Sequence, residues 1–381
     1  MEMYERKKLY TMEIVEKKKR ASNIELLRII SIFLILVTHA DFWALGEPTS
    51  FEIADNFVPS FTRVFFESLS IICIDIFVLI SGWFSIRASL KTIVKLLFQV
   101  YFLLLIIFFI YIILGWDTIN LRSISECFIF GHEFWFIKAY LGLLILSPVL
   151  NAFVSIVPKR VLQVVLVSFY LYQCIYGWIT PGASFLHYGY SITSFAGLYL
   201  LARYVKLYMV EAKSENDNNK ESLLEIKHFS WNGINRSKFF YLNIFLGVTL
   251  LDTVLYLLGY WLPFIGLHLR TMTFAISSPL VIFQSLSLLL FFKDLEIKYN
   301  PIINFVAASS FSVFILQSSQ KAELYSNIIN SIYDKYSGLG CLLLILLVII
   351  GYFIVGILLD QIRKFVWGGV ENRIPNLKLY E

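Results

Sequence analysis

Long apolar runs separated by short polar segments occupy most of the chain. Each run is close to the ~20 residues that a helix needs to cross the hydrocarbon core of a bilayer. The pattern therefore predicts an all-α integral membrane protein, a bundle of about ten transmembrane helices. The expected helices cover 24–43, 60–84, 96–114, a run beginning at 133, 161–177, 187–205, 239–260, 271–292, 301–320 and 338–360.

Polar segments frame this membrane domain, which we place at 23–362. Residues 1–22 form a basic arm, 206–238 are expected to be a mobile cytoplasmic loop, and 363–381 form a tail. Most of the 32 lysines and arginines lie in these segments and in alternate short loops. Because positive residues collect on the cytoplasmic side, the predicted topology is N-in, C-in. The basic arm has no cleavable-signal pattern, so the first apolar run is expected to act as an anchor.

Composition agrees with a membrane location. Hydrophobic residues make up 58% of the chain and charged residues 15%, against ~25% charged in soluble domains. The cytoplasmic segments account for the net charge of +5, so this charge does not point to nucleic acid. The four cysteines have no paired spacing, so neither a disulfide framework nor a metal site is expected.

An arginine and a histidine stand at the two ends of one apolar stretch, LLRIISIFLILVTH at 26–39. Ionisable groups inside a span cost at least ~2.5–3.5 kcal/mol on insertion scales, so each needs an explanation. Along a helix, Arg28 and His39 are ~16 Å apart and separated by close to three turns, so they point toward nearly the same face. A guanidinium near the cytoplasm suits a phosphate, and a neutral imidazole suits proton abstraction from a hydroxyl. Alternatively, Arg28 snorkels to the surface and His39 is a structural histidine.

Further ionisable residues are candidates on weaker grounds. Asp75 either pairs with a group inside the bundle, such as His39, or holds two helices together. Asp252 is a lone carboxylate that packing does not explain. Glu133, Trp135 and Lys138 cluster at the outer start of the fourth expected helix, where water exposure and interface anchoring are the alternatives to a functional role.

Four motifs resemble the acyltransferase-3 family of integral-membrane acyltransferases, and they occur in the family's order. The stretch NIELLRIISIFLILVTH at 23–39 matches its pattern of an arginine, ten residues and a histidine. FVLISGWF at 77–84 resembles a Phe-x-x-x-Ser-Gly signature, and FWFIKAYLGLLILSPVLN at 134–151 resembles a Trp-Phe…Tyr-Leu…Pro block. SSFSVFILQS at 309–318 resembles a late helix that commonly reads Ser-x-x-x-Tyr-Leu-x-His.

The resemblance implies an enzyme of the bacterial inner membrane. It would transfer an acyl group, usually acetyl, from cytoplasmic acyl-CoA (acetyl-CoA) to a hydroxyl of an extracytoplasmic glycan, either a polymer or a lipid-linked repeat. Arg28, Lys95 and Lys91 would bind the CoA phosphates, and no metal is implied. His39 would be the general base, directly or in a two-step relay.

The resemblance also suggests supporting residues. Asp75 or Glu133 would orient the histidine, and Trp135, Lys138 and Gln317 would bind or position the acceptor.

Two positions depart from the family pattern. An Arg-x-x-Arg pair before the third helix is represented only by Lys95, with Lys91 or Arg87 as substitutes for the missing arginine. Gln317 replaces the late-helix histidine, and an amide can hydrogen-bond but cannot exchange protons near neutral pH.

A membrane transporter of polysaccharides or small molecules is the alternative function. Arg28, Asp75 and Asp252 would then line a substrate path. The chain shows no internal repeat, which weakens an inverted-repeat transporter. Deletion should abolish surface polymer if the chain is an exporter, and should leave unacylated polymer if it is an acyltransferase.

Overall fold

The computed structural model describes residues 21–129, 131, 134–179, 186–211, 239–319 and 322–373, and within them the chain is almost entirely helical, with no β-strand. The segments 1–20, 212–238 and 374–381, which hold most of the predicted arm and loop and the last part of the predicted tail, lie outside the described residues. The elements, in chain order, are α2 (Ser22–Thr38), η1 (His39–Trp43), α3 (Ser50–Asp55), α4 (Phe57–Ser70), α5 (Cys73–Trp83), α6 (Leu90–Ile113), α7 (Leu121–Ser125), α8 (Trp135–Ile156), α9 (Lys159–Gln173), η3 (Cys174–Ile179), η4 (His187–Gly189), α10 (Ile192–Tyr204), η5 (Val205–Glu211), α12 (Phe240–Leu258), α13 (Gly266–Thr273), α14 (Pro279–Asp294), α15 (Pro301–Ala307), α16 (Ser310–Ser318), α17 (Glu323–Lys335), α18 (Gly338–Val370) and η8 (Glu371–Arg373).

Eight helical segments among the described residues are long and apolar enough to cross a membrane. They coincide with eight of the expected runs and confirm an all-α membrane protein. The other two expected spans correspond to α10 and α14, whose 13 and 16 residues are shorter. The count of ten and the N-in, C-in orientation therefore stay predictions.

Two expected helices are broken and one is longer than expected. The run 60–84 is divided into α4 and α5 by a turn at 71–72, and the run 301–320 is divided into α15 and α16. The last helix, α18, continues ten residues past the expected end, to Val370. Its buried carboxylate Asp360 is paired with Arg363 at 2.6 Å, so the two charges neutralise each other within the helix.

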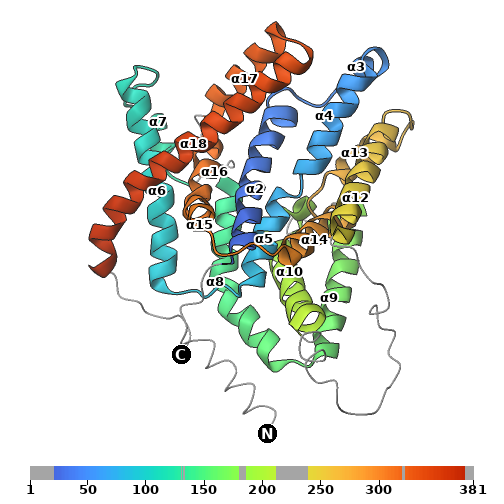
Figure 1. Cartoon of the computed structure of the whole chain (residues 1–381), viewed down its shortest axis with the longest axis vertical. Coiled ribbons are helices and arrows are strands. Elements are labelled where there is room, and N and C mark those ends of the chain that lie inside the picture. The colour runs from blue at the N-terminus through green and yellow to red at the C-terminus, as the bar shows by residue number, and fades with distance from the viewer. Residues whose placement is uncertain are drawn as a thin grey trace.

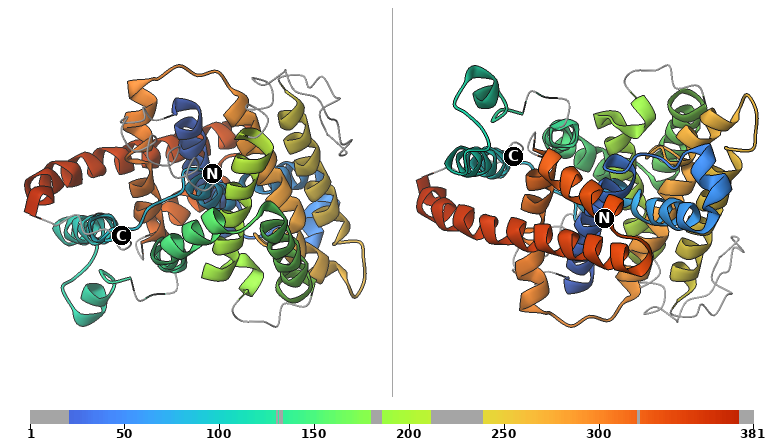
Figure 2. Two further views of the ribbon diagram at one scale, coloured as in Figure 1. Left: turned by 90° about the horizontal axis from the view of Figure 1, so that it is seen from below. Right: turned by 90° about the horizontal axis from the view of Figure 1, so that it is seen from above.

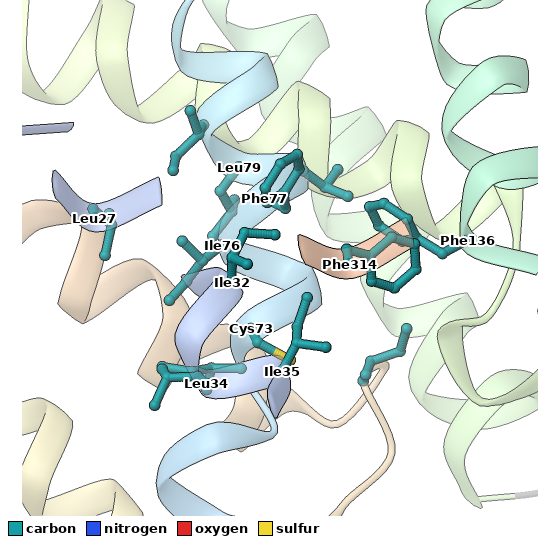
Figure 3. Close-up of a cluster of buried hydrophobic side chains, with 14 of the residues drawn as sticks. Leu27, Ile32, Leu34, Ile35, Cys73, Ile76, Phe77, Leu79, Phe136 and Phe314 are labelled. Carbon is teal, nitrogen blue, oxygen red and sulfur yellow. The ribbon is translucent and has the colours of Figure 1, made fainter. Parts of the chain in front are cut away.

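The centre of the bundle is formed by α2 and α5. Figure 3 shows Leu27, Ile32 and Ile35 of α2 beside Ile76 and Phe77 of α5, with aromatic rings of α8 and α16 closing the cluster. This central packing holds α2, which carries Arg28 and leads into His39, in the middle of the bundle.

The Ser-Gly motif of α5 has a packing role. A Cβ placed at Gly82 would lie 2.5 Å from the backbone oxygen of Tyr199 in α10, so only glycine allows this approach. The hydroxyl of Ser81 lies 3.1 Å from that of Tyr140 in α8. The motif thus holds α5 against two neighbouring helices.

One end of the bundle carries short helices, and one edge carries two long ones. In Figure 1, α3 and α17 lie at the top, at the same end as the C-terminal part of α2. The two views of Figure 2 place α6 and α18 together at one edge of the molecule. The helices α6 and α18 both pack against α16, which connects that edge to the centre.

Candidate active site

The candidate base lies on a π-helical turn that ends the first span. The α-helical part, α2, stops at Thr38, and His39–Trp43 form the π-helix η1. A π-turn widens the helix locally and often occurs at functional sites. Within this turn, His39 contacts Gln317, Asp41 pairs with an arginine, and Trp43 is exposed.

Gln317 of α16 is hydrogen-bonded to His39. The Nδ1 atom of the imidazole faces the Oε1 atom of the amide. Because Oε1 can only accept, Nδ1 carries the hydrogen and donates it. In the neutral imidazole, Nε2 is then the unprotonated nitrogen. Gln317 is buried, with 2% of its surface exposed. This pair therefore presents an imidazole in the tautomer that a general base requires.

Trp43 lies beside this pair and faces outward. Its ring centroid is 5.6 Å from that of His39, and 71% of its surface is exposed. A large exposed indole next to a candidate base offers a flat apolar face to a ligand.

Asp41 forms an ion pair that supports the same turn. The Arg63 Nε atom of α4 donates to Asp41 Oδ1 at 2.7 Å, and its Nη2 donates to the backbone oxygen of Gly46. The guanidinium also lies 5.7 Å from the ring centroid of Tyr333 in α17. Neither Arg63 nor Asp41 was a predicted site residue, although an arginine and a carboxylate near the same end of two adjacent spans were a usable signal.

Arg28 lies near the opposite end of α2 from His39. Its Nη1 is 2.8 Å from the carboxylate of Glu25, which is buried, while 24% of the Arg28 side chain is exposed. Arg28 and His39 do not touch, and the rise of α2 separates them by ~16 Å. A ligand that reached both would have to run along the helix.

Lys91 and Lys95 lie at the start of α6, beside the end of α18 rather than beside α2. The Nζ atom of Lys91 is 3.0 Å from Glu371 Oε1. This hydrogen bond, with the nearby charges of both lysines, lowers the pKa of Glu371 below its usual range. The structure thus brings the two lysines together, but it does not bring them to Arg28.

A further basic cluster, which sequence analysis missed, lies near these lysines. Asp360 of α18 is fully buried and accepts hydrogen bonds from Arg363 and from Gln99 of α6. Lys364 lies 3.6 Å from the same carboxylate and donates to Ser309 Oγ at 2.5 Å. The i, i+3 and i, i+4 spacing of these charges was the signal that could have found the cluster.

Asp75 and Asp252 are both completely buried, and neither carboxylate has a hydrogen-bond partner among the described residues. Asp75 is therefore not bonded to His39. The structure places it in α5, and the residue that contacts Nδ1 of His39 is Gln317.

The residues expected at the start of α8 are only partly described. Glu133 lies outside the described residues. The ring of Trp135 packs edge-on against that of Tyr190, with centroids 4.6 Å apart, and Lys138 Nζ donates to the Gly131 oxygen at 2.9 Å. Within the described part of the chain, no group of three His, Cys, Asp or Glu side chains could hold a metal ion.

Comparison with known proteins adds one result. A family model described as an acyltransferase domain matches residues 22–365, nearly the whole chain. Neither a curated protein nor a solved structure matches it.

Proposed function

The chain belongs to the acyltransferase-3 family, and from this premise we propose that it moves an acyl group, acetyl in the simplest case, from cytoplasmic acyl-CoA to a hydroxyl of a glycan on the outer side of the bacterial inner membrane. Membership supports a membrane acyltransferase. The observation that carries the finer proposal is the His39–Gln317 hydrogen bond, which leaves Nε2 free to take a proton.

The reaction proposed at this site is a direct transfer. Nε2 of His39 takes the proton of the acceptor hydroxyl, and the oxygen attacks the carbonyl carbon of the thioester. The carbon–sulfur bond breaks, and the CoA thiolate recovers the proton from the imidazolium. Gln317 Oε1 accepts from Nδ1 throughout, so it stabilises the positive charge that develops on the ring.

Two features support the assignment of the substrates. Arg28 has an exposed fraction and a charge suited to a phosphate, at the end of α2 that the predicted topology places in the cytoplasm. Trp43 offers an exposed flat face next to His39, and sugar rings stack on such faces through their C–H groups. We assign Arg28 to the donor and Trp43 to the acceptor.

The decisive test is the replacement of His39 by alanine. The variant, purified and inserted normally, should transfer no labelled acetyl group from acetyl-CoA to surface glycan in membrane vesicles. His268→Ala is the matched control, because that histidine is exposed and, within the described part of the chain, forms a hydrogen bond to the backbone oxygen of Ile179. Normal glycan acylation by the His39 variant would remove the catalytic assignment.

Transport is the second candidate function. The buried carboxylates Asp75 and Asp252, which have no hydrogen-bond partner among the described residues, favour it, because such groups often line ion or substrate paths. Quantification of surface polymer in a deletion strain separates the two. An exporter predicts that the polymer is lost, and an acyltransferase predicts a normal amount of polymer without the acyl group.

A further inference from the structure

A cleft lies between α6 and α18 at the edge of the bundle. At one end the two helices are joined: Phe98 and Trp367 have ring centroids 5.0 Å apart, and Gln99 donates to Asp360 at 3.1 Å. Toward the other end, together with α16 and α17, they line an open cleft of about 430 Å³. Figure 2 shows these two helices together at the periphery, and the lining side chains Ile110 and Val355 are exposed there.

The lining of this cleft is almost wholly apolar. Aliphatic side chains of α6 and α18, such as Ile110 and Val355, form its sides, and Leu316 of α16 forms its back. The lining residues that have a polar side-chain atom are Tyr111, Trp116, Ser319 and Tyr352. A water-soluble ligand gains nothing in such a place, whereas a hydrocarbon chain fits it.

The cleft shares its wall with the candidate active site. Leu316 lines the cleft, and the next residue, Gln317, binds His39. Tyr352, another lining residue, packs edge-on against Tyr325 of α17, with centroids 4.7 Å apart. The hydroxyl of Tyr325 donates to the Leu36 backbone oxygen at 2.7 Å, one turn before His39.

We propose that this cleft holds the hydrocarbon tail of the acceptor, so that the acceptor glycan is presented on a lipid carrier of the polyprenyl type and not as a free polymer. The proposal rests on the proposed function above. A tail between α6 and α18 would leave the polar head of the carrier at the outer end of α16, close to His39. The donor is not the occupant, because the contacts that join α6 and α18 close the end facing its expected side of approach.

Gly351 allows the cleft to be filled without distorting the protein. It lines the cleft on α18, and a Cβ there would meet no atom within 4 Å. Gly351→Phe therefore occupies the space of the tail. Gly368→Phe is the matched control, since Gly368 is on the same helix, is equally open and lies away from the cleft.

The binding arm uses the full chain in lipid nanodiscs and a polyprenyl diphosphate monosaccharide that carries a photoreactive diazirine in its tail. Crosslinks should map to cleft residues such as Ile110 and Val355, fall about tenfold in Gly351→Phe and persist in Gly368→Phe, since loss of even two buried methylenes corresponds to that change in affinity. Excess unlabelled glycolipid should compete, and phosphatidylglycerol should not. Equal competition by phosphatidylglycerol, or crosslinks spread over the outer face of α18, would overturn the proposal.

The activity arm separates this proposal from the proposed function. The unmodified chain should acylate the polyprenyl-linked sugar about tenfold better than the same sugar without its tail, and Gly351→Phe should lose that preference while it keeps turnover of the free sugar. Equal rates on both acceptors would refute the tail site and keep the acyltransferase. Specific crosslinks without acyl transfer to either acceptor would keep the lipid site and refute the acyltransferase.

Discussion

Replacement of Gln317 by leucine tests the role of the hydrogen bond to His39. Leucine has a similar size but cannot accept a hydrogen bond, so the Nδ1–H group loses its partner and the tautomer is no longer fixed. Leaving a buried donor unsatisfied costs ~1–3 kcal/mol. If that cost is borne in the transition state, where the imidazolium needs the partner most, kcat should fall ~5- to 150-fold.

The assay is steady-state transfer of labelled acetyl groups from acetyl-CoA, with kcat and the KM for the donor measured separately. The KM should change little, because Gln317 contacts His39, at the opposite end of α2 from Arg28. Gln317→Glu should restore much of the rate, since a carboxylate also accepts from Nδ1. Ser318→Ala is the control, because its hydroxyl has no partner among the described residues.

A second readout reports the tautomer directly. Nitrogen-15 spectra of the chain labelled at its five histidines, assigned by substitution, should show His39 protonated at Nδ1 and a mixture of tautomers in Gln317→Leu. A leucine variant with unchanged kcat would refute the positioning role. The same conclusion would follow if His39 carried its hydrogen on Nε2 in the unaltered chain.

Two further predictions concern stability. Gly82→Leu should lower the thermal midpoint, since its Cβ would lie 2.5 Å from a backbone oxygen and overpacking costs ~1–3 kcal/mol. Gly247→Leu is the control and should leave the midpoint unchanged, because a Cβ there meets nothing within 4 Å. Equal midpoints for the two variants would contradict the close approach of α5 and α10. Glu371→Gln should lower the midpoint slightly at neutral pH and not in acid, as measured by thermal scans over a pH series. The reason is that the bond to Lys91 lowers the pKa of Glu371, so its contribution is present above the unfolded pKa and disappears as the pH falls through the folded pKa; a difference that grew in acid would contradict this sign.

Hydropathy predicted the spans well because the bilayer imposes a length and a polarity on each of them. It could not show the turn between α4 and α5, because the residues at 71–72 are as apolar as those of a continuous helix. It also placed the start of α14 too early. There, Pro279 occupies the first turn, and it is the residue type that begins helices.

Only part of the candidate site could be predicted from the sequence. Arg28 and His39 lie on one helix, so their spacing was visible as a local pattern. The partner of His39 lies 278 positions away, and no periodicity connects two helices at that separation. Gln317 was singled out only because it replaces the histidine that the family pattern leads one to expect. Asp75 was a reasonable partner for His39 by chemistry, but the packing of α5 buries it elsewhere.

If Arg28 binds the donor as proposed, the rise of α2 between Arg28 and His39 sets the length that a donor molecule must have. A compound bound at Arg28 can then place its acyl carbonyl beside His39 only if a narrow linker ~16 Å long joins the two groups. Pantetheine is such a linker. Acetyl phosphate carries its acyl group directly on the phosphate, so it cannot reach Arg28 and His39 at the same time. High-energy acyl compounds of that compact kind should therefore be neither substrates nor effective competitors, however reactive they are in solution.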